Sequence, residues 1–563
     1  MKPAPLRNSP LFIALLVNAI TLAVCLFVNG VRYESLDDYF MHSVLTGAYG
    51  GEYDVHLYFI NAIYGYFLRP FYAIFPTIGW YSLFEILSVF CSFVAISFVV
   101  LRRFKNMIGK WLALLVITCV SPDFYLHVAF TQCAAITTAA GILLFAVGRF
   151  ERNLRYLLLA CPFLIAGFVF RINMFQLGLP TLGVIVLYNI IRERKIWLSS
   201  LAVLAVLAGL LEGIKAFDSS LYKGGGYDYY AAYQGVRSYF GDGAFYDQEA
   251  LTSELEERGI GSRDLRYLNA WYFYDNNVFS RDSLNNLIRY AERYRFEPNY
   301  AKMPFAVMRA ISNTLMRGSV WCWALICLSL IYFSNRRNWW VPWASVILLC
   351  IPYTYLLMVN RVVDHVESGI WAFAVVFVLS FLRKEDIPED TRTKAFIRIM
   401  VLVCFASLVM VSGRLAIENG LKPARYAKQD GTDWDAFLQY AAERSNDVFL
   451  LSFDRYQALA TYRGNIYKAV APRSLDNIYS TGYWNIHLPA MNRELEKRGV
   501  SNIFKDIKNK NVYMMDDVVS LSLVPYYSEH YHEMLEIDTL RTFGSMRMLK
   551  YHLAEGHDEN EKD

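Results

Sequence analysis

The chain has 563 residues, of which 55% are apolar and 19% are charged, and its formal net charge is +4. Soluble domains carry about 25% charged residues, so this composition argues against a cytosolic enzyme, a disordered protein and a coiled coil. The net charge is too small, and the basic runs are too short, for a nucleic-acid-binding surface. Tyr, Phe and Trp make up 16% of the chain. Together these values indicate a membrane protein for which nucleic acid is not an expected partner.

The nine cysteines all lie in apolar runs of the sequence. Their spacing contains neither a Cys-x-x-Cys motif nor the Cys/His pattern of a zinc site. We therefore interpret them as small hydrophobic residues within the membrane, and we expect any soluble region to fold without disulfide bonds.

Apolar runs close to the roughly 20 residues that a membrane-spanning helix needs recur along the chain. The first of these runs could be taken for a signal peptide, but Val28-Asn29-Gly30 is a poor cleavage site, so we expect a retained helix. In all we predict about eleven transmembrane helices, near residues 9–29, 80–101, 107–121, 128–148, 156–171, 175–191, 196–214, 318–334, 339–359, 368–382 and 396–412.

Basic residues cluster in alternate loops between these runs, for example at Arg102-Arg103 and Arg336-Arg337. Because basic loops stay on the cytoplasmic side, the pattern predicts a cytoplasmic N-terminus and a C-terminus on the outer side of the cell membrane. Residues Leu57–Phe75 are apolar but contain Arg69-Pro70 and several tyrosines. We expect this stretch to form two short helices lying in the membrane interface rather than a further span.

This topology places three long segments on the outer side, at residues 30–79, 215–303 and 413–563. The chain then divides into a membrane domain over 1–412 and a small extracytoplasmic α/β domain over 413–563. For the latter we predict strands in Asp447–Phe453 and Lys510–Met515, a strand pair over Ile537–Tyr551, and helices over Ala424–Glu443 and Arg493–Arg498.

The first outer segment concentrates acidic and histidine side chains directly after a membrane helix. Carboxylates at a bilayer surface are costly unless they are paired or lie in a wet cavity, and partial burial suits a carboxylate to act as a general base on a hydroxyl. The alternative is that Ser35 or Asp37 caps a helix and that the remaining charges are solvated. The candidates are Asp37, Asp38, Glu52, Asp54 and His56.

The third predicted span has about 14 apolar residues, which cover only about 21 Å at the rise of an α-helix. Its outer end, Ser121–His127, should therefore lie in a recess lined by protein and water, where irregular backbone is tolerated. Asp123 and His127 are candidates to face a substrate in that recess. The alternative is an ordinary helical hairpin that turns at Pro122.

Basic side chains also occur at the predicted outer ends of spans, at Arg171, Lys215 and Arg361, with His365 close to the last. The positive-inside rule disfavours cations in these places, so each needs a reason. A lipid phosphate would supply one, because Arg binds phosphate through two parallel hydrogen bonds. The alternatives are snorkelling to headgroups and pairing with nearby carboxylates.

In this arrangement the chain resembles the GT-C superfamily of membrane glycosyltransferases, which combine many spans with an acidic first outer loop, interfacial helices and often an outer C-terminal domain. Asp37-Asp38 stands at the acidic position of that family and Leu57–Phe75 at its interfacial helices, and the resemblance is closest over residues 9–191. The chain also resembles uncharacterised polytopic proteins of bacterial surface-polysaccharide clusters. The matching segments are Asp37-Asp-Tyr-Phe-Met, Trp80-Tyr-Ser-Leu-Phe and Phe130-Thr-Gln-Cys-Ala-Ala.

The resemblance implies an inverting glycosyltransferase that moves a hexosyl or pentosyl group from a polyprenyl-phosphate donor to a glycan, lipid or protein acceptor. Asp38 or Asp37 would deprotonate the acceptor hydroxyl, a role that contributes about 10²–10⁴-fold to the rate. From their predicted depth, Arg171 and Arg361 would stabilise the phosphate leaving group. The resemblance requires no cofactor, although some relatives bind a divalent cation, Mg²⁺ or Mn²⁺, through such carboxylates.

Three other functions remain open at this point. A transporter or flippase for a lipid-linked glycan would explain the cations but not the acidic loop or the outer tail of about 150 residues. A polysaccharide polymerase or ligase would use arginines of a large outer loop, such as Arg237, Arg263 and Arg266. A scaffold of a polysaccharide assembly complex would use the tail for docking.

Overall fold

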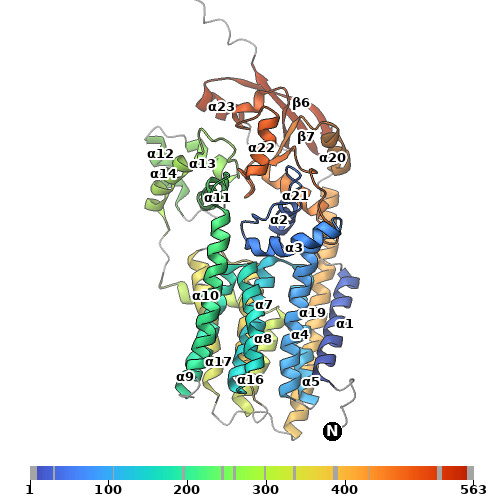
Figure 1. The fold of residues 1–563 in the computed structure, drawn as a ribbon. Helices are drawn as coiled ribbons and strands as arrows, with labels where there is room; N and C mark the ends of the chain where they lie inside the picture. Colours follow the sequence, from blue (N-terminus) through green and yellow to red (C-terminus); the bar gives the residue numbers. More distant parts are fainter. Residues whose placement is uncertain are drawn as a thin grey trace, which may run out of the picture.

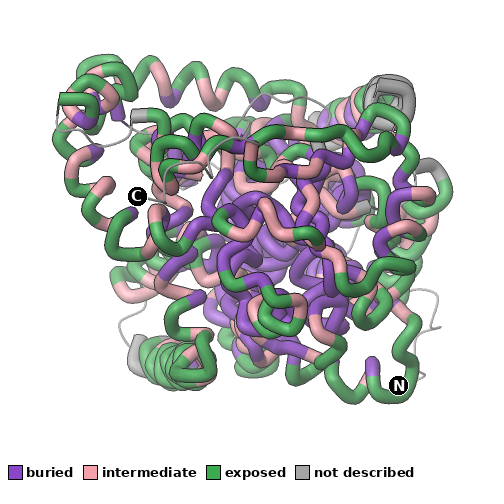
Figure 2. Tube along the Cα trace, turned by 90° about the horizontal axis from the view of Figure 1, so that it is seen from above, coloured by how far each residue is buried: buried purple, intermediate pink, exposed green. Residues whose placement is uncertain are grey.

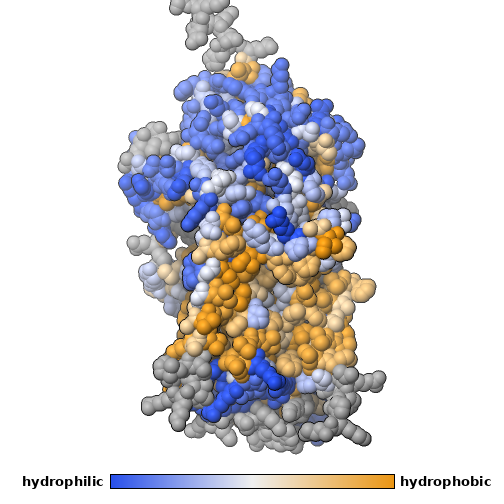
Figure 3. Space-filling view, viewed as in Figure 1, coloured by the Kyte–Doolittle hydropathy of each residue, from blue (hydrophilic) through white to orange (hydrophobic). Residues whose placement is uncertain are grey.

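A bundle of long helices forms one end of the computed structural model, and a mixed sheet with its helices forms the other (Figure 1). The side surface of the bundle is mainly hydrophobic, whereas the sheet end is mainly hydrophilic (Figure 3). The structure describes residues 9–29, 32–104, 107–192, 197–241, 246–257, 262–296, 300–333, 338–359, 361–383, 391–429, 432–516 and 523–554.

Each of the eleven predicted spans coincides with a helix. They are α1 (Pro10–Asn29), α4 (Trp80–Arg103), α5 (Met107–Val120), α7 (Phe130–Phe150), α8 (Leu154–Phe170), α9 (Ile172–Arg192), α10 (Trp197–Leu221), α16 (Gly318–Phe333), α17 (Trp340–Met358), α18 (Asp364–Phe381) and α19 (Thr391–Gln429).

Within the described part of the chain, seven helices are long and apolar enough to cross a membrane. The number is eight if α16 forms one span with the preceding helix α15 (Met303–Asn313), from which it is bent by 107°. α5 and α8 are apolar but have only 14 and 17 residues, and α10 carries three charged residues in its second half. The chain is therefore a polytopic helical protein, and the total of eleven spans stays a prediction.

The helix α7 is buried on all sides within the bundle. Viewed from above, buried residues gather at the centre of the molecule (Figure 2). All but one of its residues are buried, because α4, α8, α9 and α18 pack around it. Small side chains allow the close approach. A side chain at Gly141 would collide with Leu164 of α8, and one at Gly167 would collide with Thr138 of α7.

The segment between α1 and α4 contains two helices, α2 (Leu36–Leu45) and α3 (Ala62–Ile74). Ser35 caps α2, as one of the two alternatives proposed from sequence, by accepting a hydrogen bond from the Asp37 N–H at 3.1 Å. The prediction of two short helices within Leu57–Phe75 is wrong. Asn61 caps a single helix there, and Pro70 lies inside it, while the residues before Asn61 are irregular.

Two short strands tie this segment to the turn after α5. β1 (Arg32–Tyr33) pairs in parallel with β2 (His127–Val128), which follows the four-residue helix α6 (Pro122–Tyr125). Ser121–His127 is largely buried, so the short span α5 does end in a protein-lined position as predicted. The first acidic residues after α1 are thereby held next to the beginning of α7.

The segment after α10 forms a small helical lobe at the side of the sheet (Figure 1). It is composed of α11 (Tyr227–Gly241), α12 (Gln248–Glu257), α13 (Ser262–Asn269), α14 (Arg281–Ala291) and the 3₁₀ turn η2 (Glu292–Tyr294). The next helix, α15, packs against α17 of the bundle. Tyr230 and Tyr233 of α11 are fully buried, so part of its tyrosine stripe is core rather than surface.

The C-terminal region contains a five-stranded sheet in the order β4-β3-β5-β7-β6. β4, β3 and β5 run parallel to one another, whereas β7 is antiparallel to both of its neighbours, β5 and β6. β3, β5 and the β6–β7 hairpin lie at the predicted strands. The predicted helix over Ala424–Glu443 is instead divided between the end of α19 and α20, because Asp433 starts a new helix as its N-cap. The elements are α20 (Trp434–Glu443), β3 (Val448–Leu451), α21 (Phe453–Arg463), β4 (Ile478–Ser480), α22 (Pro489–Lys497), the 3₁₀ turn η4 (Lys505–Lys508), β5 (Val512–Asp516), α23 (Leu523–Tyr531), β6 (Leu535–Phe543) and β7 (Met546–Leu553).

The sheet domain packs directly on the two segments that follow α1 and α10. Leu475 N–H donates to the Ala48 carbonyl at 3.0 Å, and Phe273 N–H donates to the Thr481 carbonyl at 2.9 Å. Buried apolar residues of all three parts belong to one continuous core. The sheet domain therefore forms a cover over α2 and α3 rather than a separate module.

Candidate functional site

Asp38 lies on the side of α2 that faces α4 and α7. Its side chain is fully buried, and its Oδ1 accepts hydrogen bonds from the Tyr81 hydroxyl at 2.8 Å and from the Phe130 N–H at 3.3 Å. Glu85, four residues after Tyr81 on α4, is also fully buried and lies within hydrogen-bonding contact of Asp38. The inward side of α2 therefore places two carboxyl groups next to each other.

Asp38 and Glu85 hold at most one negative charge between them. Asp38 Oδ2 and both Glu85 carboxyl oxygens have no donor among the described residues, and two adjacent buried carboxylates cannot both ionise. Burial, and secondarily the charge of Asp37, raises the pKa of Asp38 to about 8, against the opposing hydrogen bonds from Tyr81 and Phe130. At neutral pH Asp38 is therefore mainly protonated, and its O–H supplies a donor within the pair.

The same buried layer contains a chain of neutral hydrogen bonds. The Tyr33 hydroxyl lies 2.5 Å from Ser82 Oγ and 3.1 Å from His42 Nδ1, and the Tyr72 hydroxyl lies 2.8 Å from His42 Nε2. Burial lowers the pKa of His42 to about 3, so its imidazole is neutral. This network fixes α2 against α3 and α4 without adding charge.

Asp37 points to the opposite side of α2 and is half-buried. Its Oδ1 accepts a hydrogen bond of 2.6 Å from the Tyr483 hydroxyl, which comes from the sheet domain. The neighbouring Trp484 packs edge-on against Phe59 at a ring distance of 5.5 Å, and the Arg171 guanidinium lies 5.8 Å from the same Phe59 ring. The sheet domain thus reaches both Asp37 and the surroundings of Arg171.

Arg171 and the charged groups that act on His365 form the next part of the site. Arg171 ends α8 as its C-cap, hydrogen-bonds Thr131 Oγ1, and lies 4.8 Å from the Phe130 ring. The charged groups that act on the half-buried His365 imidazole at the start of α18 are Arg171, Glu34, Asp37 and Arg361. Asp37, Arg171 and Arg361, which were selected from separate parts of the sequence, therefore all act electrostatically on His365.

The two candidates from the turn after α5 have protein partners. His127 Nδ1 lies 2.9 Å from Glu34 Oε2, which places His127 at the edge of the His365 group. Asp123 instead faces Arg317 at 3.6 Å and Arg414 at 3.7 Å. The recess predicted around Asp123 is thus occupied by an ion-pair network.

Arg317 is the centre of that network and was not identified from the sequence. It stands at the bend between α15 and α16, with only 9% of its side chain exposed, and donates to Asp364 Oδ1 at 2.7 Å and to Glu367 Oε2 at 3.1 Å. A lone arginine just before an apolar run was the one available signal. Its carboxylate partners are about 50 residues away on α18, so spacing alone does not reveal the network.

A cavity of about 630 Å³ adjoins the network, between α15, the end of α17 and the start of α18. Arg309, Asn313 and Arg317 line it on one side, and Asp364 and Glu367 line it on the other. Val362 and Asp364 line the cavity. They are the immediate sequence neighbours of Arg361 and His365, respectively. The cavity therefore lies next to the group of residues around His365.

The remaining acidic candidates lie elsewhere. Asp54 Oδ1 is 2.6 Å from His56 Nδ1, and Asp54 Oδ2 accepts a hydrogen bond from Tyr227 of α11. Glu52 is 82% exposed and lies 3.5 Å from Arg493 of α22. These three residues join α2's segment to the helical lobe and the sheet domain, and the structure does not bring them to His365. Lys215 is exposed on α10.

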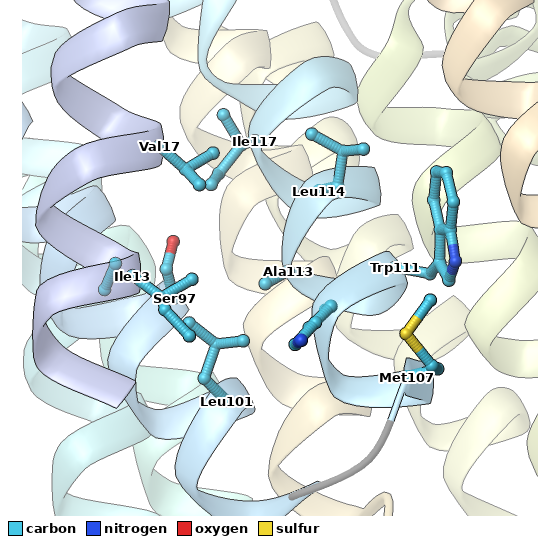
Figure 4. Close-up of a pocket in the computed structure, with 11 residues that line it drawn as sticks. Ile13, Val17, Ser97, Leu101, Met107, Trp111, Ala113, Leu114 and Ile117 are labelled. Carbon is cyan, nitrogen blue, oxygen red and sulfur yellow. The ribbon is translucent and has the colours of Figure 1, made fainter. Parts of the chain in front are cut away.

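A second, smaller cavity lies far from these groups, between α1, α4 and α5 near the end of the bundle opposite the sheet (Figure 4). It measures about 290 Å³ and its lining is almost entirely apolar, with Ile13, Val17, Leu101 and Trp111 among the labelled side chains. Such a crevice fits hydrocarbon rather than a reacting polar group.

In the ranges that the structure describes, no group of three or more His, Cys, Asp or Glu side chains is arranged to hold a metal ion. No protein-family model, curated protein or solved structure matches this chain. We therefore infer its function from the arrangement of its side chains and from the resemblance described above.

Proposed function

We propose that this protein is an inverting glycosyltransferase that takes a sugar from a polyprenyl-phosphate donor at the outer face of a cell membrane. Its acceptor is a hydroxyl of a surface glycan, lipid or protein. The observation that carries the proposal is that the neighbouring Tyr483 and Trp484 of the sheet domain connect Asp37 with the surroundings of Arg171. Asp37, Arg171 and Arg361 also all act electrostatically on His365. A carboxylate and two guanidinium groups within electrostatic range of one imidazole suit a reaction between a hydroxyl and a lipid phosphate ester.

Asp37 rather than Asp38 is the base in this proposal. Asp38 is fully buried and burial raises its pKa to about 8, so it is mainly protonated and a poor proton acceptor at neutral pH. Asp37 is half-buried and accepts a hydrogen bond from Tyr483, which leaves one carboxylate oxygen to take the proton of the acceptor. The acceptor oxygen then attacks the anomeric carbon as the bond to the phosphate oxygen breaks.

Arg171 and Arg361 stabilise the leaving phosphate in this scheme. The phosphate gains negative charge as it departs, and guanidinium groups already in place lower the barrier without reorganisation. His365 is within electrostatic range of two carboxylates, Glu34 and Asp37, and of both arginines. Its ring is suited to orient either the sugar or the phosphate.

The cavity beside α15 gives the donor a place at the membrane surface. α15 is amphipathic, with Phe305 and Met308 70–72% exposed, as is typical of a helix lying in the membrane interface. Arg309 and Asn313 of the same helix line the 630 Å³ cavity. A lipid phosphate arriving from the bilayer would pass these residues before it reaches Arg361.

The test replaces the native gene by variants of equal protein level and measures surface glycans together with polyprenyl-linked lipids. Arg171→Ala and Arg361→Ala should each remove one sugar from the surface glycan and cause its polyprenyl-phosphate derivative to accumulate on the outer leaflet. Removal of such a charged group costs about 10²–10³-fold in rate. Lys215→Ala, on the exposed side of α10, is the matched control and should leave the glycan unchanged.

Two results would contradict the proposal. The first is an unchanged surface glycan in both arginine variants. The second is accumulation of the lipid-linked sugar on the inner leaflet alone, because that is the outcome expected of a transporter or flippase.

A further inference from the structure

A cavity of about 450 Å³ lies in the sheet domain, at the ends of α20, α21 and α22. This volume is within the range of small-ligand sites. Its lining is about as polar as it is apolar, with Leu438, Ala441 and Ile478 at the apolar part. The polar part consists of charged groups, amides and hydroxyls, among them Arg463, Arg473, Lys497, Arg498, Asp476 and Glu494.

The charges of the cavity do not cancel. Its four cations face two carboxylates, and Glu494 is shared by Lys497 at 2.6 Å and Arg498 at 2.9 Å. Asp476 is shared between Arg473 at 3.2 Å and the Gly50 N–H at 2.6 Å. Among the described residues, Arg463 forms no ion pair. It is exposed at the end of α21.

Helix ends explain only part of this excess. Cations are favoured at helix C-termini, and Arg498 donates to the Ser445 carbonyl at 2.8 Å and to the Glu494 carbonyl at 2.6 Å. Asn477 donates to the Ala441 and Arg444 carbonyls in the same way. With these carbonyls already satisfied, the remaining N–H groups of Arg473 and Lys497, both 61% exposed, face a solvent-accessible space.

One wall of the cavity is fixed to the chain that follows α2. Arg473 N–H donates to the Gly47 carbonyl at 2.9 Å, Leu475 N–H donates to the Ala48 carbonyl, and Asp476 accepts from Gly50. Gly51 has a φ of +83°, and a side chain there would collide with the Arg473 guanidinium. The cavity is therefore held at a constant position relative to the helix that carries Asp37.

We propose that this cavity binds an anionic part of the acceptor, namely a sugar residue that carries a carboxylate or a phosphate group. A space rich in N–H donors and in net positive charge recognises such groups, and neutral sugars would leave the excess of four cations over two carboxylates unbalanced. That this sugar belongs to the acceptor rests on the proposed function, whereas the binding of an anionic sugar by the cavity does not depend on it. The site contributes affinity away from the reacting atoms, so its loss affects KM rather than kcat.

The experiment titrates the purified full-length protein in lipid nanodiscs with three probes of equal length. These are trigalacturonic acid, maltotriose bearing one phosphate ester, and unmodified maltotriose. Saturable binding of the carboxylate probe, the phosphate probe or both supports the proposal and identifies the source of the charge. Added salt should weaken this binding, since exposed charges are screened within about 10 Å at 0.1 M salt.

The double variant Arg463→Gln/Lys497→Gln should weaken the binding of the anionic probe about tenfold or more, in line with the loss of charge-assisted hydrogen bonds. Lys510→Gln, an exposed lysine of the same domain outside the cavity, should bind as the native protein does. Both variants alter exposed side chains, and equal thermal unfolding verifies their folding. Binding that is absent, equal for neutral maltotriose, or unchanged in the double variant would overturn the inference.

The Asp37→Asn variant separates this inference from the proposed function. It should keep the native affinity for the anionic probe while losing sugar transfer. If the native protein binds the probe but surface glycans never depend on Arg171 or Arg361, the proposed function fails and the anion site stands.

Discussion

The two sides of α2 place adjacent aspartates in opposite surroundings. On the inward side, Asp38 is fully buried against Glu85 and Tyr81, and the hydrogen-bonded groups described in this layer carry no positive charge. On the outward side, Asp37 is half-buried, accepts a hydrogen bond from Tyr483 and, like Arg171 and Arg361, acts electrostatically on His365. Burial favours the protonated form of Asp38, whereas partial exposure suits Asp37 to chemistry.

The largest effect outside the charged residues themselves is expected for Tyr483→Phe, which disturbs the outward side alone. Loss of a hydrogen bond to a charged acceptor costs about 1.5–3 kcal/mol, so sugar transfer should fall about tenfold or more while the protein remains folded. The measurement is the rate of glycan restoration after induction of each variant. Tyr467→Phe, a half-exposed tyrosine of the same domain, serves as the control, and equal rates in both variants would remove Tyr483 from the site.

The inward side should show itself in the pH dependence of stability. The pKa of Asp38 is about 8 in the folded protein against an ordinary value near 3.8, so the folded state holds the extra proton between these values. The contribution of Asp38 to the free energy of unfolding is fully present below about pH 4 and is lost as pH rises toward 8. The pKa of His42 is lowered to about 3 in the folded protein. Its contribution to stability is therefore present above about pH 6.5 and is lost as pH falls toward 3.

Asp38→Asn tests the contribution of the coupled Asp38–Glu85 pair, because His42 is common to both proteins. Unfolding midpoints of the native protein should fall relative to those of Asp38→Asn as pH rises from 4 to 8, and the difference should then level off. A constant difference across this range would show that Asp38 is ionised in the folded state.

The smallest effect is expected for Glu52→Gln. Glu52 is 82% exposed, and its partner Arg493 is 52% exposed, so the ion pair is screened by water and contributes less than about 1 kcal/mol. Transfer and thermal stability should both match those of the native protein. A clear loss of transfer would mean that the first acidic segment takes part in chemistry beyond α2.

Hydropathy and charge predicted the positions of the long helices, because the apolar character of a spanning helix is contained in about 20 consecutive residues. Arg171 and Arg361 were selected as candidates because a cation at the outer end of a span is unusual on its own. Arg317 and Tyr483 were missed because their partners, Glu367 and Asp37, lie about 50 and 446 residues away. The opposite orientations of Asp37 and Asp38 also depend on where Ser35 caps α2, which sequence left open between two alternatives.

The most direct test of the central claim compares Asp37→Asn with Asp38→Asn in cells that contain equal amounts of each protein. The measurement is the composition of the surface glycan. The account predicts loss of one sugar in Asp37→Asn, because a base worth about 10²–10⁴-fold is gone, and near-native glycan in Asp38→Asn, because an amide replaces a protonated acid. A normal glycan in Asp37→Asn, or its loss in Asp38→Asn alone, would contradict it.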